Sequence, residues 1–128
     1  MGKAEVIFEE GSGLSRDNLA TPNATAALLQ YMSKRKCAAT FLASLPIAGV
    51  DGTLRNRMKG TAAQGNVRAK TGSLRWARSL SGYVTSAAGE RLAFCFMLNR
   101  FDNSSRSANA DLDAMTVLLA SFAGRSDR

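Results

Sequence analysis

The chain has 128 residues, of which 45% are hydrophobic and 21% charged, so its length and composition suit one domain or a large part of one. It contains no histidine, which excludes histidine bases, histidine-bound metals and Ser/His/Asp triads within the chain. The longest apolar run, residues 92–98, is too short to span a membrane. The first ten residues are acidic and lack an apolar segment, so we expect no signal peptide in this chain.

The first half of the chain predicts two helices. Residues 6–8 favour a short edge strand, and the Gly/Ser sequence of residues 11–15 predicts a loop. Thr21 and Pro22 are a typical N-cap and first helical residue, and apolar residues follow at helical spacing, so a helix is expected over about 22–34. Phe41, Leu42 and Leu45 predict a second short helix over about 38–45. It should end before Pro46, because the residue before a proline disfavours helical backbone angles.

The second half of the chain predicts three strands and a helix. The strands are expected over about 66–74, 79–86 and 91–99, the last two joined by a hairpin turn. An apolar stripe then predicts a helix over about 108–123, with candidate caps at 103–105. The expected fold class is therefore mixed α/β of the α+β type, with an antiparallel three-stranded meander covered by helices.

The two cysteines and the single tryptophan are further candidates for a functional role. Cys37 and Cys95 are too few and too far apart for a zinc site, so neither a metal nor a cofactor is predicted. Cys95 lies in an apolar strand, which favours a small buried side chain over a reactive thiol. Trp76, between the first two strands, either packs under a helix or flanks a ligand groove.

The strand at residues 67–74 has an unusual chemistry. Its side chains alternate, so Lys70 and Gly72 share one face, and the hydroxyls of Thr71 and Ser73 stand beside them. A cation, two hydroxyls and a strand edge suit an extended ligand that ends in a carboxylate and adds as an extra strand. The alternative is that the strand simply enters a turn at the Thr-Gly-Ser sequence.

The positive charge is concentrated around this strand. The formal net charge is +7, and residues 52–89 contain seven arginines and lysines but no acidic residue. Such a segment attracts anionic ligands, so a basic nucleic-acid-binding module is an alternative function. However, the sequence contains no recognisable nucleic-acid motif, and the aromatic residues do not interleave with the cations, so we expect no nucleic-acid partner.

Four motifs occur in a fixed order, in residues 11–19, 45–54, 70–73 and 80–84. Together they resemble the C-terminal part of D-alanyl-D-alanine carboxypeptidases of the class C low-molecular-mass penicillin-binding proteins, over residues 10–99. The resemblance implies one partial domain, residues 1–128, from the C-terminal part of the serine β-lactamase/penicillin-binding transpeptidase-type fold. It also implies a serine peptidase of cell-wall peptides that β-lactams acylate.

The resemblance assigns substrate binding to the Lys-Thr-Gly-Ser sequence. Lys70 and Thr71 would hold the terminal carboxylate of a peptidoglycan stem peptide or of a β-lactam, with Lys70 also counted as catalytic. Gly72 and Ser73 would belong to the same binding strand, whose backbone after Gly72 would contribute to the oxyanion hole.

The resemblance also assigns the Gly-Ser-Gly-Leu-Ser loop to a catalytic motif. Ser15 resembles the serine of the family's Ser-x-Asn loop, which would relay a proton to the leaving amine. Because the spacing departs from Ser-x-Asn, Asn18 is favoured as the second loop residue and Asp17 is the alternative.

The nucleophile motif of the family, a serine with a lysine three residues later, has one match, at Ser33 and Lys36. It stands in the wrong order and in a basic run, which is unsuited to a lysine of lowered pKa, so we interpret it as a chance match. We therefore expect a C-terminal fragment that is inactive alone and pairs with a missing N-terminal half or with a second copy. The parent enzyme is expected in the periplasm or otherwise outside the cytoplasm. A non-catalytic module that binds cell-wall peptides is a further alternative, and a preference for carboxypeptidase or endopeptidase chemistry is left open.

Overall fold

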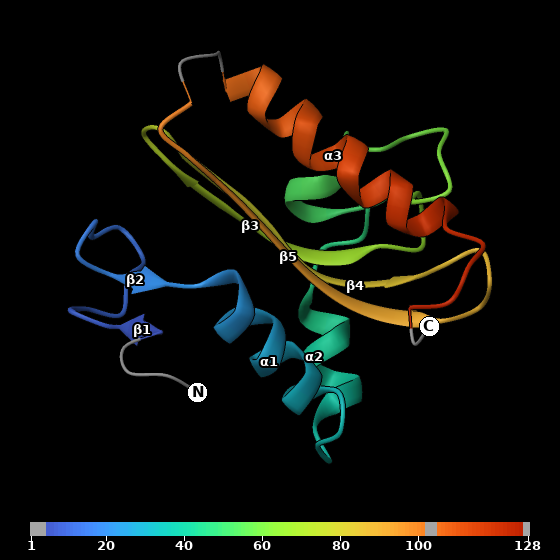
Figure 1. Cartoon of the computed structure of the whole chain (residues 1–128), viewed down its shortest axis with the longest axis horizontal. Helices are drawn as coiled ribbons and strands as arrows, with labels where there is room; N and C mark the ends of the chain where they lie inside the picture. Colours follow the sequence, from blue (N-terminus) through green and yellow to red (C-terminus); the bar gives the residue numbers. More distant parts are fainter. Residues whose placement is uncertain (1–4, 102–104, 127–128) are drawn as a thin grey trace.

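The computed structural model describes residues 5–101 and 105–126. Its centre is an antiparallel sheet with the strand order β3-β4-β5, formed by Arg68–Leu74, Ala77–Thr85 and Arg91–Asn99. Helix α3 covers one face of this sheet, and α1 and α2 lie on the other face (Figure 1). The expected α+β class, a three-stranded meander with covering helices, is confirmed.

The register of the sheet separates two faces. Ala69, Leu80 and Phe94 belong to the buried cluster that also contains Leu112 of α3. Tyr83 belongs to a second cluster, with side chains from the α1–α2 region. Since side chains alternate along a strand, Lys70 and Gly72 lie on the α1 face of β3, as does Arg68, whose partner in β4 is Tyr83.

The β3–β4 hairpin is tighter than the sequence predicts. Leu74 pairs with Ala77, so β4 begins two residues before the expected start at 79, and Arg75 and Trp76 alone form the turn. Trp76 takes a left-handed φ of 62°, a conformation that costs energy for a bulky residue. The usual turn residues are absent here, so sequence patterns make the turn two residues too long.

A side-chain N-cap marks the start of α1, and the helix bounds differ from the expected ones by a few residues. In α1, Pro22–Met32, the Thr21 hydroxyl accepts a hydrogen bond from the Ala24 N–H at 3.1 Å. This helix ends two residues before the expected position 34. Helix α2 spans Ala38–Ser44, and a short 3₁₀ helix, η1, spans Gly52–Leu54. Helix α3 spans Ser105–Ser121 instead of 108–123, and the caps expected at 103 and 104 lie outside the described residues.

Two packed clusters hold these elements together. Leu54, Leu80 and Leu112 are fully buried between the sheet, η1 and α3. On the other face, the buried Tyr83 hydroxyl donates a hydrogen bond to the Leu29 carbonyl at 2.6 Å and so fastens α1 to β4. Partial burial raises the pKa of the Cys95 thiol, and both cysteines are free.

The N-terminal residues form an arm that extends from the start of α1 (Figure 1). The two-residue strand β1, Val6–Ile7, pairs with β2, Leu19–Ala20, which the sequence does not predict. The side chains of both strands are exposed. In the described ranges of the chain, no helix has the length and hydrophobicity needed to cross a membrane.

Candidate functional site

The outer edge of β3 is closed along its first residues and open along its last. The Ala69 N–H donates to the Pro46 carbonyl at 3.0 Å, and the Ala48 N–H donates to the Val67 carbonyl at 2.9 Å. Beyond Ala69, no other strand pairs with this edge in the part of the chain that the structure describes. Because backbone groups alternate sides along a strand, the N–H groups of Thr71 and Ser73 point toward the same open edge as that of Ala69.

Lys70 stands beside this open edge. Its side chain is exposed, and its ammonium donates to the Thr71 carbonyl at 2.6 Å. The Thr71 hydroxyl lies 3.2 Å from the hydroxyl of Thr53 in η1. The structure thus brings one ammonium, two hydroxyls and the outward backbone groups of β3 together at one short stretch of edge.

The packing around residue 72 favours a glycine, which the sequence alone does not reveal. Its partner in β4 is Ser79, and a Cβ at residue 72 would overlap the Ser79 hydroxyl oxygen. Thus the Ser79 side chain occupies the space that a residue other than glycine would need at position 72.

Two cavities lie where the N-terminal arm meets the end of the sheet. The smaller, of about 310 Å³, is lined by residues that include Asn18 and Leu19 from the arm and Gly72 and Ser73 from β3. Neither Ser15 nor Lys70 is part of this lining. The structure therefore brings Asn18 together with the end of the Lys-Thr-Gly-Ser sequence, whereas Ser15 and Lys70 do not share this cavity.

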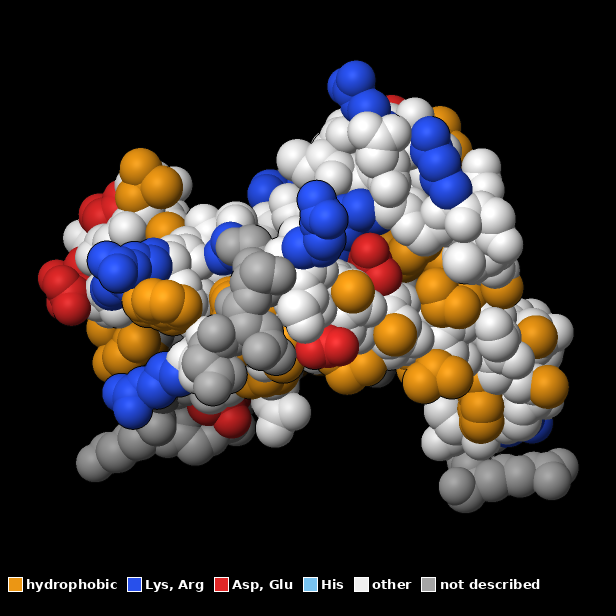
Figure 2. Space-filling model, turned by 90° about the horizontal axis from the view of Figure 1, so that it is seen from above, with side chains coloured by type: hydrophobic (Ala, Val, Ile, Leu, Met, Phe, Trp, Pro, Cys, Tyr) orange, Lys and Arg blue, Asp and Glu red, His pale blue; other side chains and the backbone are white. Residues whose placement is uncertain are grey.

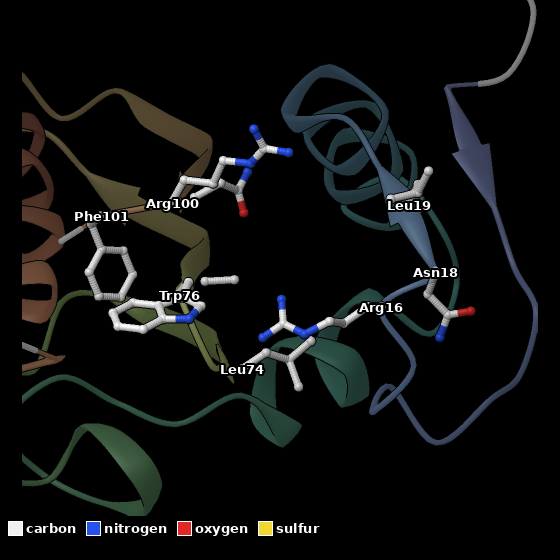
Figure 3. Close-up of a pocket in the computed structure, with 9 residues that line it drawn as sticks. Arg16, Asn18, Leu19, Leu74, Trp76, Arg100 and Phe101 are labelled. Carbon is white, nitrogen blue, oxygen red and sulfur yellow. The ribbon is translucent and has the colours of Figure 1, made fainter.

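The larger cavity, of about 780 Å³, lies beside the β3–β4 turn (Figure 3). Arg16 extends from the arm toward Leu74 and Trp76, and Arg100 lines the other wall (Figure 3). The indole of Trp76 is 48% exposed and packs edge-on against Phe101, with ring centroids 6.5 Å apart. Of the two roles considered for Trp76, the structure supports the one beside a groove.

Hydrogen bonds within the arm occupy the predicted loop residues. The Ser15 hydroxyl accepts from the Asp17 N–H at 3.1 Å. The Asn18 side chain binds Glu10 and the Glu9 N–H, the latter at 2.8 Å. The structure thus gives Asn18 a role in holding the loop, while its assignment to a catalytic motif stays a prediction.

Glu10 is the residue of this region that sequence reasoning missed. A hydrogen bond from the Ser12 side chain, followed by the backbone N–H groups of Ser15 and Ser12, lowers the pKa of its carboxyl to about 2. The signal in the sequence is an acidic residue directly before Gly-Ser-Gly, because such a flexible segment can wrap its N–H groups around an anion.

Ser33 and Lys36, which match the Ser-x-x-Lys pattern, lie outside the two cavities and the open edge of β3. The Ser33 hydroxyl donates to the Gln30 carbonyl at 2.7 Å at the end of α1, and Lys36 is exposed in the loop that follows. An exposed lysine lacks the desolvation that activates a lysine as a base.

The charged residues near β3 are dispersed in the structure. The Arg57 guanidinium binds the Asp113 carboxylate of α3 at 2.7 Å. Arg75 lies over the Trp76 ring, and Arg78 lies over Phe101, 5.2 and 5.8 Å from the respective ring centroids. Viewed from above, blue side chains stand in several separate groups (Figure 2).

The chain is similar to known D-alanyl-D-alanine carboxypeptidases over almost its whole length. Residues 2–122 match the profile of a family described as D-Ala-D-Ala carboxypeptidase 3 (S13). A D-alanyl-D-alanine carboxypeptidase of Actinomadura sp. (strain R39) is 45% identical over 126 residues, which cover 94% of this chain and 23% of the relative. The D-alanyl-D-alanine carboxypeptidase DacB of Haemophilus influenzae is 39% identical, over 83% of this chain and 23% of the relative.

The fold is similar to a solved structure. The crystal structure of penicillin binding protein 4 (dacB) from Haemophilus influenzae, complexed with a novel β-lactam, superimposes with a TM-score of 0.84 and 32% identity. The match covers 93% of this chain and 30% of that one. The chain spans about a quarter of the length of the curated relatives that it matches. The expected penicillin-binding type of fold is confirmed.

Proposed function

Because this chain belongs to the D-Ala-D-Ala carboxypeptidase 3 (S13) family, we propose that it supplies the substrate-binding strand of a serine D-Ala-D-Ala carboxypeptidase. The substrate is a cell-wall stem peptide, and a β-lactam occupies the same place. The observation that carries this proposal is the open half of the β3 edge, where Lys70 stands beside outward backbone groups.

Each group at this edge has one task in the proposal. The peptide adds to β3 as an extended strand, because the outward N–H and C=O groups of Thr71 and Ser73 offer hydrogen bonds to its backbone. Lys70 and the Thr71 hydroxyl bind the terminal carboxylate through charge-assisted hydrogen bonds. The Ser73 N–H donates to the carbonyl oxygen of the scissile bond and stabilises the negative charge that develops there.

The attacking serine and its base belong to another polypeptide segment in this proposal. Lys36 is exposed, so the Ser33 and Lys36 pair lacks the desolvated lysine that activates a serine. The chain alone therefore binds substrate but does not cleave it. Its partner is the remainder of a parent enzyme that works outside the cytoplasm. β5, the opposite edge strand of the described sheet, offers that remainder, or a second copy of this chain, a place to pair.

The proposal is tested by the binding of acetyl-D-Ala-D-Ala to the isolated chain, with the terminal amide of the same peptide as the matched ligand. Lys70→Met should weaken binding of the acid about 10- to 100-fold, since a hydrogen bond to a charged group contributes about 1.5–3 kcal/mol. The same substitution should leave binding of the amide unchanged.

Lys36→Met is the matched control for charge, because it removes a lysine from an exposed loop. It should leave the affinity for both peptides as in the unsubstituted chain. Equal affinity of the unsubstituted chain for acid and amide would refute carboxylate binding at Lys70.

The roles of Ser15 and of the loop partner, Asn18 or Asp17, stay predictions. They are tested in an assembly of this chain with a polypeptide that carries the Ser-x-x-Lys motif. If Ser15 relays a proton, Ser15→Ala should abolish acylation by a fluorescent penicillin without changing acetyl-D-Ala-D-Ala affinity. Full labelling of that variant would instead show that the Ser15 hydroxyl only stabilises the local turn, through its hydrogen bond from the Asp17 N–H.

A further inference from the structure

The carboxylate of Glu10 is the centre of the arm's polar contacts. It accepts hydrogen bonds from the N–H groups of Ser12, Gly13 and Ser15, at 2.5, 3.1 and 3.1 Å. Both carboxylate oxygens take part, because Ser12 donates to one oxygen and the other two residues donate to its neighbour. An anion that accepts several backbone N–H groups fixes the conformation of the segment that supplies them.

Asn18 joins the far end of the loop to the same residue. Its side-chain nitrogen donates to the Glu10 carboxylate at 2.8 Å and to the Glu10 carbonyl at 3.1 Å. Its side-chain oxygen accepts from the N–H groups of Glu9 and Glu10, at 2.8 and 3.2 Å. We call this set of contacts, which joins Glu10 and the Glu9 N–H to residues 12–18, the Glu10 clasp.

Little apolar packing supports the loop that the clasp encloses. Leu14 is 74% exposed, and Leu19, at the start of β2, is 56% exposed. Burial of so little apolar surface contributes little to holding the loop in one position. The order of residues 10–18 therefore depends on the Glu10 clasp.

The Arg16 and Asn18 side chains of the loop lie near the end of β3. The Arg16 guanidinium donates to the carbonyl of Arg75 in the β3–β4 turn, and this turn carries Trp76 into the larger cavity (Figure 3). Asn18 lines both cavities. A displaced loop would thus move one wall of both cavities, and Gly72 and Ser73 line the smaller of the two.

We propose that Glu10 is a positioning residue: its carboxylate fixes the loop so that Arg16 holds the β3–β4 turn and the arm closes the cavity at the end of the substrate strand. The link to substrate rests on the proposed function. The positioning itself concerns the described residues alone and is measured without a substrate.

The test compares Glu10→Gln with Glu9→Gln in the full chain. Glutamine keeps the shape of the side chain but turns one acceptor oxygen into a donor, which faces the N–H groups of the clasp. The Glu9 side chain makes no contact in the clasp, although its N–H does, so Glu9→Gln makes the same charge change one residue away. The far-UV thermal unfolding of the two variants should match that of the unsubstituted chain.

Two readouts report the loop. Trypsin should cleave after Arg16 faster in Glu10→Gln than in Glu9→Gln, with the product identified by mass. Trp76 is the only tryptophan of the sequence, so acrylamide quenching of its fluorescence reports the turn that Arg16 holds. Quenching should increase in Glu10→Gln to the level of an Arg16→Ala variant.

The proposal stands if both readouts change in Glu10→Gln and neither changes in Glu9→Gln. Faster cleavage with unchanged quenching would overturn it, because the clasp would then order the loop without positioning Arg16. Unchanged cleavage, or an Arg16→Ala variant that quenches like the unsubstituted chain, would also overturn it. A failure of acetyl-D-Ala-D-Ala to bind leaves these outcomes unaffected and bears on the proposed function instead.

Discussion

The sheet with α3 and the N-terminal arm, residues 5–20, are held in place by different interactions. Side chains such as Leu80 and Leu112 are fully buried between β4 and α3, whereas Val6 and Ile7 of β1 are 41% and 40% exposed. The arm relies instead on hydrogen bonds that converge on Glu10. Apolar burial thus accounts for global stability, while a small polar network accounts for the position of a loop beside the candidate site.

The largest effect is expected from the centre of the sheet region. Leu112→Ala removes a fully buried side chain of α3 and should lower the free energy of unfolding by about 2–5 kcal/mol. Leu118→Ala on the same helix, where the side chain is 71% exposed, should change it by less than about 0.5 kcal/mol. Urea denaturation measures both, and similar losses would show that α3 is not held by its buried face.

Within the sheet, the two glycines Gly82 and Gly72 should differ in how much a substitution by alanine destabilises the fold. A Cβ at Gly82 would lie 2.6 Å from the Ala69 Cα, so the backbone of β3 would have to move. Gly82→Ala should therefore cost about 1–3 kcal/mol. Gly72→Ala would meet the Ser79 side chain instead, which can rotate away, so its cost should be smaller. Denaturation midpoints in the opposite order would contradict this packing.

One buried hydrogen bond is expected to make a small contribution to the attachment of α1. Tyr83→Phe removes the donor to the Leu29 carbonyl, which still accepts from the Ser33 N–H at 3.0 Å. Since no acceptor is left unsatisfied, the loss should be about 1 kcal/mol in thermal or urea unfolding. A loss above about 3 kcal/mol would place the anchor of α1 in this bond instead of in the packing around it.

The position of the arm should respond to acid. Hydrogen bonds to the Glu10 carboxylate lower its pKa from 4.5 to about 2. A carboxyl whose pKa is lower in the folded than in the unfolded chain stabilises the folded loop fully when the pH is above the unfolded-state pKa. This contribution disappears as the pH falls toward the folded-state pKa of about 2. Acrylamide quenching of Trp76 should therefore increase between these pH values and be independent of pH in Glu10→Gln. An unchanged acid response in that variant would assign it to another carboxyl.

The sequence predicts the sheet well because its signals are local. Alternation along residues 91–99 and the turn at Gly89 are sufficient to place β5, and Thr21 with Pro22 places the start of α1. The β3–β4 turn is predicted two residues too long, because Arg75 and Trp76 are not typical turn-forming residues. Trp76 takes a positive φ because the strands on both sides of it are paired.

The candidate site is predicted less completely, because its geometry depends on contacts between distant residues. The Lys-Thr-Gly-Ser sequence is visible in the chain, yet the closure of half the β3 edge by residues 46–48 is not. In the same way, the pattern of the Gly-Ser-Gly loop draws attention to Ser15 and Asn18. It does not reveal that Asn18 binds Glu10, eight residues earlier.

The pairing of residues 46–48 with the beginning of β3 limits what can lie along the remaining edge. From Thr71 to Leu74 that edge extends roughly 10 Å, at about 3.3 Å per residue, which is the backbone length of a tripeptide. Pro46 stands as a barrier next to Ala69, immediately beyond Lys70. A peptide whose chain continued past the lysine would collide with this barrier, whereas one that terminates there would fit. In the proposed function, this neighbouring segment would therefore favour peptides that end beside Lys70 over peptides that continue past it.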